Sequence, residues 1–322
     1  MAKCIVFGAT GFIGSHLVKK LLADGHEVTT FGRRKYDPEA PDNTKLTQII
    51  GDFLNGSDID NAVAGNEYVF HFVTLTNPVS SDSDPFIDIE TNVKMTIVLL
   101  EACVKHGVKR VIYPSSGGSV YGDAKRSRHK ETDPTNPMSP YAIGKNTVEN
   151  YLRYYHLKYN LDYLCLRVSN VYGEGQELGG SNHGIVAVFL NLISNSAKLS
   201  IFGDGSMGRD YIYVEDFVTL VARIFDIKKL NYTTYNIGSG EGRSILDVVS
   251  TIENTVGIKA KLEFLPAPKS FVQAVVLDCS RAQNEFGEFM SVPFEDGVRA
   301  TWDYMSNKKH PDNGDPLLRD EN

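Results

Sequence analysis

Short apolar segments alternate with amphipathic segments through the first half of the chain. The apolar segments are rich in β-branched and aromatic residues, which is typical of buried parallel strands: KCIVFG (3–8), HEVTTF (26–31), LTQII (46–50), YVFHFV (68–73), RVIYPS (110–115) and DYLCLRV (162–168). Between them, apolar residues recur at helical spacing, as at Ile13, Leu17 and Leu21. The repeated strand–helix order predicts an α/β fold of the Rossmann type, a doubly wound parallel sheet with helices on both faces.

This pattern changes after about residue 170. A glycine-rich segment at 172–184, YGEGQELGGSNHG, is followed by irregular segments and short strands. They predict a smaller substrate-binding lobe, interleaved with the first lobe because RDYIYVEDFV (209–218) and TYNIGSG (234–240) keep the earlier strand and helix pattern. The expected division is a dinucleotide-binding domain at 1–170 to which 208–240 returns, a substrate lobe at 171–207 and 241–305, and a polar tail at 306–322.

Composition narrows the possible classes of function. The 322 residues carry a formal net charge of −7, whereas a general nucleic-acid binder has a basic excess. No apolar run is long enough to span a bilayer, and the N-terminus has no cleavable signal pattern. The cysteines fit neither a zinc site nor a disulfide framework: Cys4, Cys103, Cys165 and Cys279. We expect a cytoplasmic protein with reduced thiols, no metal, and no nucleic-acid or membrane partner.

A glycine pattern follows the first predicted strand directly. The segment GATGFIGSHL places Gly8, Gly11 and Gly14 between that strand and an amphipathic helix. The first glycine permits a tight turn, the second lets backbone amides approach a pyrophosphate, and the third lets the helix pack closely on the strand. This context predicts an NAD(P) site at the helix N-terminus, rather than glycines that only relieve crowding, and Phe12 and Ile13 belong to the same site.

Two arginines follow the second predicted strand, where NAD-binding proteins usually have a carboxylate for the adenosine ribose. Arg33 and Arg34 suit the 2′-phosphate of NADP and favour NADP(H) over NAD, although they could also be an exposed pair or stack on the adenine. Asp52, after the third strand, is a candidate for the adenine end, or it caps a turn. Phe53 and Phe72, near the ends of the third and fourth strands, complete the expected cofactor-binding set.

A tyrosine and a lysine lie four residues apart at the start of a predicted helix, SPYAIGKNTVENYL (139–152). Tyr141 and Lys145 therefore lie on one helix face. A tyrosine with an ordinary pKa near 10 is a poor base, but a neighbouring ammonium and a positively charged nicotinamide both lower that pKa. Tyrosinate can then take a proton from a sugar hydroxyl while hydride leaves the same carbon for the cofactor. The alternative is an exposed packing pair.

Four motifs together resemble the extended short-chain dehydrogenase/reductases: GATGFIGSHL, YAIGK, RVSNVYG and GRDYIYVEDF. The chain is similar in particular to the NAD(P)-dependent nucleotide-sugar epimerase/dehydratase family, with UDP-glucose 4-epimerase-like members nearest. The resemblance extends from residue 3 to about residue 305. It implies that Tyr141 is the catalytic base and that Lys145 holds the nicotinamide ribose and lowers the pKa of the tyrosine.

The same resemblance implies roles for three further polar residues. It places Asn92 near the cofactor, gives Asn170 a contact with the sugar nucleotide, and lets Arg209 reach the diphosphate. The last role is physically reasonable because a planar guanidinium pairs bidentately with phosphate oxygens. Otherwise Asn170 caps a turn, and Arg209 pairs with Asp210 or Glu215.

The segment SSGGSVYG (115–122) departs from the family pattern. The family usually has a serine or threonine at the position of Gly117, where it hydrogen-bonds the reacting hydroxyl. Ser116 and Ser119 flank this position, and one of them, with Ser116 favoured, is expected to supply the hydroxyl unless both only satisfy strand-end amides. The 4,6-dehydratases of the family carry Asp-Glu at the positions of Gly118 and Ser119. Elimination needs such an acid and base, so a dehydratase is not expected.

These features predict an epimerase that acts at C4 of a nucleotide-linked hexose through a transient 4-keto sugar. Val275, near a family position that limits the hexose pocket, leaves room for an N-acetyl group, so both UDP-hexoses and UDP-N-acetylhexosamines are candidate substrates. The alternatives are an NADPH-dependent 4-ketoreductase, which Arg33 and Arg34 favour, and a non-catalytic NADP-binding protein, against which the Tyr–Lys pair argues. In the family, the Tyr–Lys helix and the helix that ends near His106 form a dimer face, so a homodimer is expected.

Overall fold

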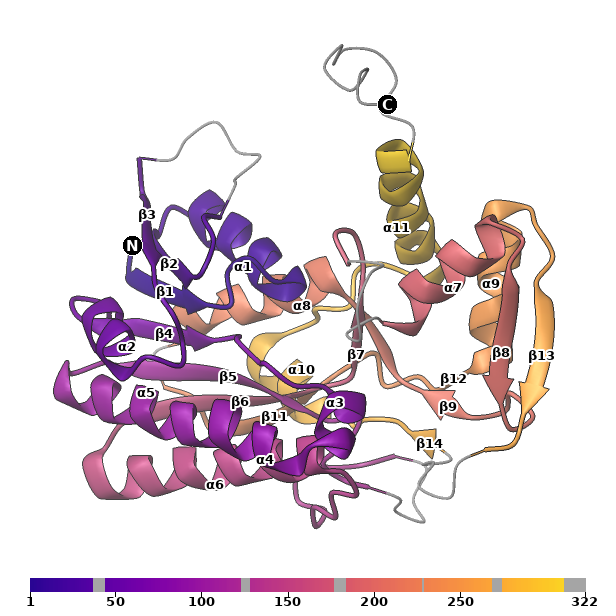
Figure 1. The fold of residues 1–322 in the computed structure, drawn as a ribbon. Helices are drawn as coiled ribbons and strands as arrows, with labels where there is room; N and C mark the ends of the chain where they lie inside the picture. The colour runs from indigo at the N-terminus through magenta and orange to yellow at the C-terminus, as the bar shows by residue number, and fades with distance from the viewer. Residues whose placement is uncertain (37–43, 123–127, 177–183, 228, 268–273, 310–322) are drawn as a thin grey trace, which may run out of the picture.

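A parallel sheet forms the centre of the larger lobe. The computed structural model describes residues 1–322 apart from 37–43, 123–127, 177–183, 228, 268–273 and 310–322. The seven strands of this sheet lie in the order β11-β6-β5-β4-β1-β2-β3 (Figure 1). Their bounds are β1 (Lys3–Phe7), β2 (Glu27–Gly32), β3 (Leu46–Ile50), β4 (Tyr68–His71), β5 (Arg110–Ser116), β6 (Asp162–Val168) and β11 (Thr234–Ile237). The chain builds outward from β1 and then returns at β4, which places a topological switch point, the usual position of a ligand crevice, between these two strands.

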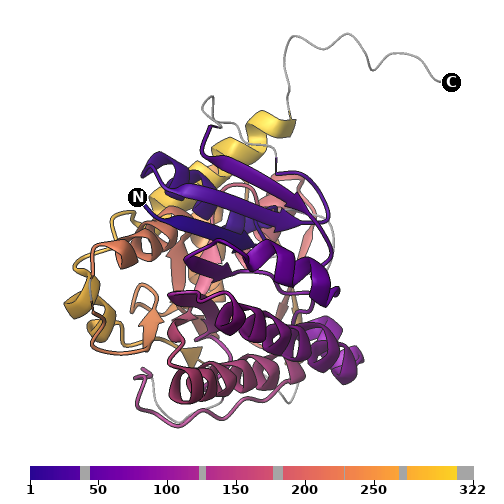
Figure 2. The same cartoon turned by 90° about the vertical axis from the view of Figure 1, so that its left-hand side faces the viewer.

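Helices cover both faces of this sheet (Figures 1 and 2). Because successive strand residues point to opposite faces, Cys4 and Val6 of β1 lie in one buried core, and Ile5 and Phe7 lie in the other. The first core includes residues of α1 (Phe12–Ala23), α8 (Val214–Ala222), the 3-10 turn η2 (Arg223–Phe225) and α10 (Ser280–Phe286). The second includes residues of α2 (Gly56–Val63), α5 (Lys94–Lys105) and α6 (Pro140–Tyr159). The predicted doubly wound fold is confirmed.

A smaller lobe has a buried core of its own. Its elements are α7 (Ile185–Ser194), α9 (Ile245–Val256), α11 (Phe294–Lys309), the paired strands β8 (Lys198–Phe202) and β13 (Lys261–Leu265), and the small sheet of β12 (Arg243–Ser244), β9 (Gly208–Arg209) and β14 (Ala274–Val275). A parallel strand pair, β7 (Asn170–Tyr172) and β10 (Tyr211–Tyr213), connects the lobes, since β7 follows β6 and β10 precedes α8. Helix α11 continues through residues 306–309, just past the buried Met305, so the first four residues of the expected polar tail are helical.

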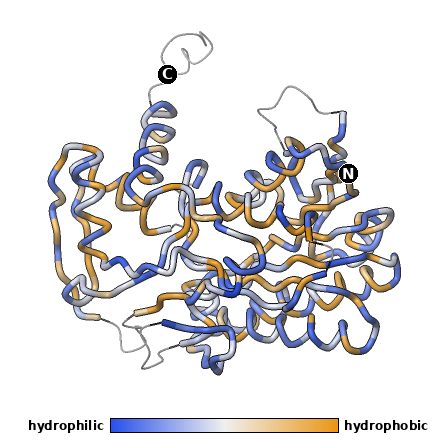
Figure 3. The backbone as a smooth tube through the Cα atoms, turned by 180° about the vertical axis from the view of Figure 1, so that it is seen from behind, coloured by the Kyte–Doolittle hydropathy of each residue, from blue (hydrophilic) through white to orange (hydrophobic). Residues whose placement is uncertain are grey.

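Three short helical segments pack against α6: α3 (Pro78–Ser83), α4 (Pro85–Asp88) and the π-helical turn η1 (Ile89–Val93), which continues into α5. Along the longer helices, polar and apolar stretches follow one another (Figure 3), as expected for helices with one buried face. None of the helices in the described ranges is long and apolar enough to cross a membrane. The four cysteines are buried free thiols.

Candidate active site

A cleft of about 1070 Å³ lies over the carboxyl ends of the main-sheet strands and extends against the smaller lobe. Its lining includes the glycine loop after β1, the ends of β4, β5 and β6, the start of α6, and side chains of the smaller lobe such as Ile185, Met207 and Arg209. Pockets for one drug-sized ligand occupy roughly 300–1,000 Å³. The cleft is therefore at the upper end of, or larger than, a pocket for one such ligand.

The glycine loop after β1 has the shape that a pyrophosphate site requires. Gly8 has a φ of +87°, and a Cβ at this position would lie 2.7 Å from the backbone of Phe72. A Cβ at Gly14 would lie 2.1 Å from the carbonyl oxygen of Gly8, so neither position accepts a side chain. Gly11 is the N-cap of α1 and supplies no capping side chain, which leaves the first helix amides available to an anion at the cleft surface.

The expected adenosine end is formed by residues that follow β2 and β3. Arg33 and Arg34 are exposed and line the cleft together with Asp52 and Phe53. Asp52 also caps a turn, because its Oδ1 accepts a hydrogen bond from the amide of Leu54 at 3.0 Å. Phe53 is buried beside the ring of Phe7, with 5.9 Å between the ring centroids. These four residues, which the sequence predicts to bind the cofactor, therefore lie along the same cleft. Asp52 and Phe53 also have contacts within the protein.

The Tyr–Lys pair is fixed at the start of α6. Ser139 is the N-cap of this helix and accepts a hydrogen bond from the amide of Ala142, while the amide of Tyr141 donates to Ser81 Oγ at 3.1 Å. Lys145 Nζ donates to the carbonyl oxygen of Pro114 in β5 at 2.9 Å, and it lies 5.7 Å from the centroid of the Tyr141 ring. Helix and strand therefore hold both functional groups in the cleft.

The pKa values of this pair differ from the simple expectation of an ammonium that lowers the tyrosine pKa. Burial, and secondly the charge of Asp88, raise the pKa of Tyr141 to about 12, while a hydrogen bond with Ser116 lowers it. Burial lowers the pKa of Lys145 to about 8, against the opposing effect of Asp88. Sequence reasoning missed both Asp88 and the desolvation of the site, which act in the opposite direction to the lysine charge.

Ser116 and Ser119 of SSGGSVYG act as a connected pair rather than as separate alternatives. Ser119 Oγ donates to Ser116 Oγ at 2.7 Å, and Ser116 is the residue that hydrogen-bonds Tyr141. Both serines line the cleft. Gly117, in contrast, faces the protein interior, because a Cβ there would lie 2.7 Å from both the Arg167 carbonyl oxygen and Leu277 Cδ1. The geometry therefore supports Ser116 as the hydroxyl next to Tyr141.

The predicted substrate residues Asn170 and Arg209 both line the cleft. Asn170 Nδ2 donates to the carbonyl oxygen of Asp210 at 2.9 Å, which fixes its amide at the edge of β7. Burial lowers the pKa of Arg209. Asp210 and Glu215, the alternative partners of Arg209, have other contacts. The Asp210 carboxylate accepts hydrogen bonds from the amides of Ser239 and Gly240, and Glu215 contacts His16 of α1. Val275 is buried beside Arg209 on β14 and is not among the described residues that line the cleft.

Asn92, expected near the cofactor, is not among the described residues that line the cleft and lies behind its wall. Its Nδ2 donates to Asp88 Oδ1 at 2.8 Å and to Thr76 Oγ1 at 2.6 Å, and its Oδ1 accepts from the amide of Leu75 at 3.0 Å. Leu75 and Thr76 themselves line the cleft. Asn92 therefore shapes the cleft wall near the glycine loop from behind.

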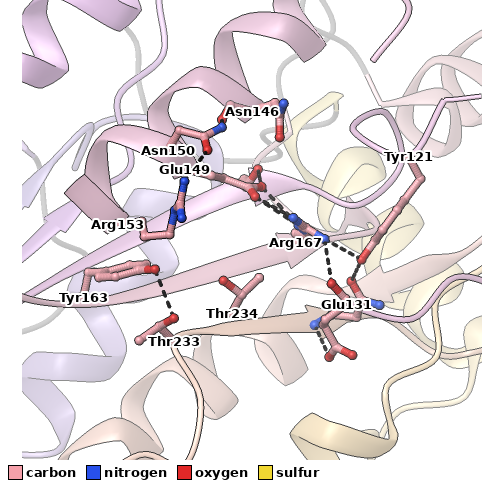
Figure 4. Close-up of polar contacts among 12 residues, drawn as sticks. Tyr121, Glu131, Asn146, Glu149, Asn150, Arg153, Tyr163, Arg167, Thr233 and Thr234 are labelled. Atoms are coloured by element: carbon pink, nitrogen blue, oxygen red, sulfur yellow. Dashed lines mark hydrogen bonds and ion pairs between the residues drawn. The ribbon is translucent and has the colours of Figure 1, made fainter. Parts of the chain in front are cut away.

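A buried ionic network under β5 was not predicted (Figure 4). Arg167 of β6 donates to Glu149 of α6 at 2.7 Å and to the Tyr121 hydroxyl at 3.0 Å, and Tyr121 donates to Asn236 at 2.6 Å. Glu149 also accepts from Ser115 Oγ at 2.5 Å. The network joins the serine segment to the Tyr–Lys helix. Its only sequence signal was that Tyr121 and Arg167 belong to strand-end motifs.

Comparisons with known proteins agree with this geometry. A profile of the NAD dependent epimerase/dehydratase family matches residues 4–238. The chain is 34% identical to UDP-glucose 4-epimerase of Mycolicibacterium smegmatis over 313 residues, which cover 95% of this chain and 99% of that protein. It is similar to the crystal structure of UDP-glucose 4-epimerase from Thermotoga maritima with UDP-glucose, with a TM-score of 0.88, 31% identity, and coverage of 95% and 99%. UDP-N-acetylglucosamine 4-epimerase from Methanobrevibacter ruminantium, in complex with UDP-N-acetylmuramic acid, has a TM-score of 0.87, 27% identity, and coverage of 95% and 99%.

Proposed function

Because the chain belongs to the NAD dependent epimerase/dehydratase family, we propose that it is a 4-epimerase of a UDP-hexose or a UDP-N-acetylhexosamine. The observation that carries this proposal is the chain of hydroxyls from Ser119 through Ser116 to Tyr141, beside Lys145, in the same cleft as the glycine loop. It supplies a group that can exchange a proton with a sugar hydroxyl within reach of a dinucleotide site.

The glycine loop fits the pyrophosphate of a nicotinamide dinucleotide. Gly8 and Gly14 leave no space for a Cβ, so the backbone itself forms the surface, and the N-terminus of α1 favours negative charge there. A nicotinamide held there would supply the hydride acceptor for oxidation of the sugar at C4 and the hydride donor for its reduction from the opposite face. Lys145, held by β5, would bind the nicotinamide ribose.

Proton transfer is the task of Tyr141 and Ser116. As C4 is oxidised, the proton of the 4-hydroxyl passes to the Tyr141 oxygen, and the Ser116 hydroxyl stabilises the charge on that oxygen. The Lys145 ammonium lies close enough to favour the same charge. The same groups return the proton when C4 is reduced. Arg209 and Asn170 line the same cleft, where Arg209 would bind the diphosphate and Asn170 would position the sugar nucleotide.

Incubation with UDP-glucose and UDP-N-acetylglucosamine, followed by analysis of the sugars and of nicotinamide absorbance, tests the function. Formation of the C4 epimer without net change of cofactor is the expected result. Tyr141→Phe should abolish it, whereas Tyr151→Phe, on the same helix but not among the cleft residues, should not. Stoichiometric oxidation of NADPH by a 4-keto sugar, without epimer formation, would refute the proposal.

The second candidate function is an NADPH-dependent 4-ketoreductase, and the exposed Arg33 and Arg34 on the cleft favour it. They also support a preference for NADP over NAD, because guanidinium groups bind a 2′-phosphate well. If this preference holds, Arg33→Ala combined with Arg34→Ala weakens NADP binding strongly and NAD binding little. Equal losses for both cofactors would contradict the preference.

We further propose a cytoplasmic homodimer. Large apolar residues on α6 are exposed, among them Ile143 at 52%, Tyr154 at 47% and Leu157 at 75%. Exposed apolar patches of this kind commonly mark an interface. Light scattering at micromolar concentration should give the mass of two chains, and a monomeric mass would contradict the dimer. The reduced, buried cysteines are consistent with the cytoplasm.

A further inference from the structure

Asp88 is a buried carboxylate at the end of α4 for which the proposed reaction gives no role. It is 2% exposed. Its Oδ1 accepts hydrogen bonds from Thr76 Oγ1 at 2.5 Å and from Asn92 Nδ2 at 2.8 Å. These contacts fix the carboxylate, because Thr76 belongs to the cleft wall and Asn92 is held behind it by the amide of Leu75.

The other carboxylate oxygen lies directly against the Tyr–Lys helix. A Cβ placed on Gly144 would be 1.8 Å from Asp88 Oδ2, so the space that a side chain at position 144 would need is filled by the carboxylate. Gly144 is three residues after Tyr141 and precedes Lys145, which puts the carboxylate on the helix face that carries the tyrosine. The glycine in YAIGK is therefore explained by the close approach of Asp88.

Asp88 and Lys145 face the same small cavity of about 10 Å³, roughly the space of one water molecule. His71 lines this cavity as well. The hydroxyl of Thr96 donates to the carbonyl oxygen of Asn92 at 2.6 Å, so His71 Nε2, 2.7 Å from that hydroxyl, must be the protonated ring nitrogen. Burial lowers the pKa of His71 to about 3, so the ring is neutral and its Nδ1 is an acceptor. Of the described residues around the cavity, Lys145 alone carries a positive charge.

We propose that Asp88 is a positioning residue that seats the start of α6 and serves as the counter-ion that keeps Lys145 in its ammonium form. This inference rests on the proposed function of the Tyr141–Lys145 pair. Without a counter-ion, burial favours the neutral amine, which can neither bind a ribose hydroxyl as strongly nor stabilise a tyrosinate.

The surrounding charges single out Asp88. Besides Asp88 and Tyr141, the titratable groups of the described residues that face Lys145 are His71 of β4, Tyr113 of β5, Cys165 of β6 and Glu149 of α6. Burial lowers the pKa of His71 to about 3 and raises the pKa values of Tyr113 and Cys165 well above their usual range, so these three groups are neutral. Glu149 is neutralised by its ion pair with Arg167. Apart from burial, Asp88 has the largest effect on the pKa values of Lys145 and Tyr141, and it raises both pKa values.

Asp88→Asn therefore has a distinctive expected effect on the pH profile of kcat/KM. Activity requires the tyrosinate of Tyr141 together with the ammonium of Lys145, and loss of the Asp88 charge favours loss of both protons, so both limbs of the profile should move to lower pH. Each ionisation constant should change about tenfold or more, since a nearby charge commonly moves a pKa by a unit or more. A residue that only supports the fold would lower turnover and leave both limbs in place.

Asp216→Asn is the matched control. Asp216 of α8 is 3% exposed and accepts hydrogen bonds from Ser291, away from the Tyr–Lys helix. Its variant should lose stability but keep both limbs at their wild-type positions. If Asp88→Asn does not fold, Gly144→Ala, which pushes the carboxylate away from α6, is measured in its place and should move the limbs in the same direction.

A spectroscopic titration separates this inference from the proposed function. Tyrosinate absorbance is followed against pH in wild type and in Asp88→Asn, each corrected with the corresponding Tyr141→Phe variant. Ionisation of Tyr141 at lower pH in Asp88→Asn supports the inference even if the protein epimerises no sugar. Unchanged limbs together with unchanged Tyr141 ionisation would overturn it.

Discussion

Glu149 of α6 joins the serine segment, β6 and the Tyr–Lys helix, and Glu149→Gln tests how much this junction contributes. The carboxylate accepts hydrogen bonds from Arg167 at 2.7 and 3.1 Å and from Ser115 Oγ at 2.5 Å. Both side chains of the ion pair are only 10% exposed. Glutamine has nearly the same shape, so the substitution removes the charge and one acceptor without leaving a cavity.

The expected cost follows from the charge that stays behind. Breaking a buried ion pair by removing one partner costs about 3–5 kcal/mol, because the remaining charge is buried without compensation. Glutamine keeps one oxygen, and Arg167 keeps its hydrogen bond to Tyr121, so we expect the lower end, about 3 kcal/mol. A loss of this size is a large part of the 5–15 kcal/mol typical of a folded domain. Turnover should fall as well, since Ser115 precedes Ser116.

Urea unfolding followed by circular dichroism measures this loss, together with sugar turnover of the folded variant. The midpoint should fall while the slope with urea stays constant. Glu263→Gln is the control, because Glu263 pairs with Lys198 at 2.6 Å on the surface, and its midpoint should be unchanged. A loss below about 1 kcal/mol for Glu149→Gln, with normal turnover, would show that the network is not needed to hold the site.

Three further predictions follow from contacts near the cleft. His16 Nδ1 lies 2.5 Å from Glu215 Oε1, and its Nε2 lies 2.9 Å from the carbonyl oxygen of Glu174. Both partners are acceptors, so both ring nitrogens carry protons and the ring is an imidazolium. Burial lowers the pKa of His16, but these two contacts outweigh it and raise the pKa. The stabilisation of the folded state by the His16 imidazolium is fully present below the pKa of the unfolded chain, near 6.5, and is lost as pH rises through the higher pKa of the folded state. The free energies of unfolding of wild type and His16→Gln should therefore converge at high pH. A difference that stays constant with pH would contradict this. Ser116→Ala should lower kcat about 100-fold or more and Ser119→Ala considerably less, as single-turnover rates can show; equal losses would contradict the order of the hydroxyl chain. Gly117→Ser should destabilise the protein by about 1–3 kcal/mol in urea unfolding and give no gain in turnover, because the new side chain meets Arg167 and Leu277; a stable, faster variant would contradict the interior orientation of Gly117.

Local sequence patterns were sufficient for the parts of the site that depend on local geometry. The glycine loop could be predicted because a tight turn and a close helix approach both need residues without a Cβ, and the structure places Gly8 and Gly14 accordingly. The Tyr–Lys spacing predicted a shared helix face in the same way. The parallel sheet followed from apolar strand segments alternating with amphipathic helices, a pattern that few other architectures satisfy.

The remaining features depend on contacts between distant segments, which spacing does not encode. Asn92 has a family position near the cofactor, yet its side chain is directed to Asp88 and Thr76, because η1 presents it to the back of the cleft wall. The direction of the Tyr141 pKa shift required knowledge of its burial and of a carboxylate more than fifty positions earlier in the chain. The helical continuation through residues 306–309 lacked an apolar pattern and is a geometric extension of α11.

The adjacent glycines of SSGGSVYG differ in how freely they can vary. Gly117 is enclosed by the backbone of β6, whereas a Cβ on Gly118 would meet no atom within 4 Å and would project at the cleft lining. A protein engineer can therefore place an acid at position 118 without remodelling the fold. Together with a glutamate in place of Ser119, this is the carboxylate pair that the family's dehydratases carry. At position 118, a change of reaction type is therefore limited by the chemistry of the side chain and not by steric hindrance.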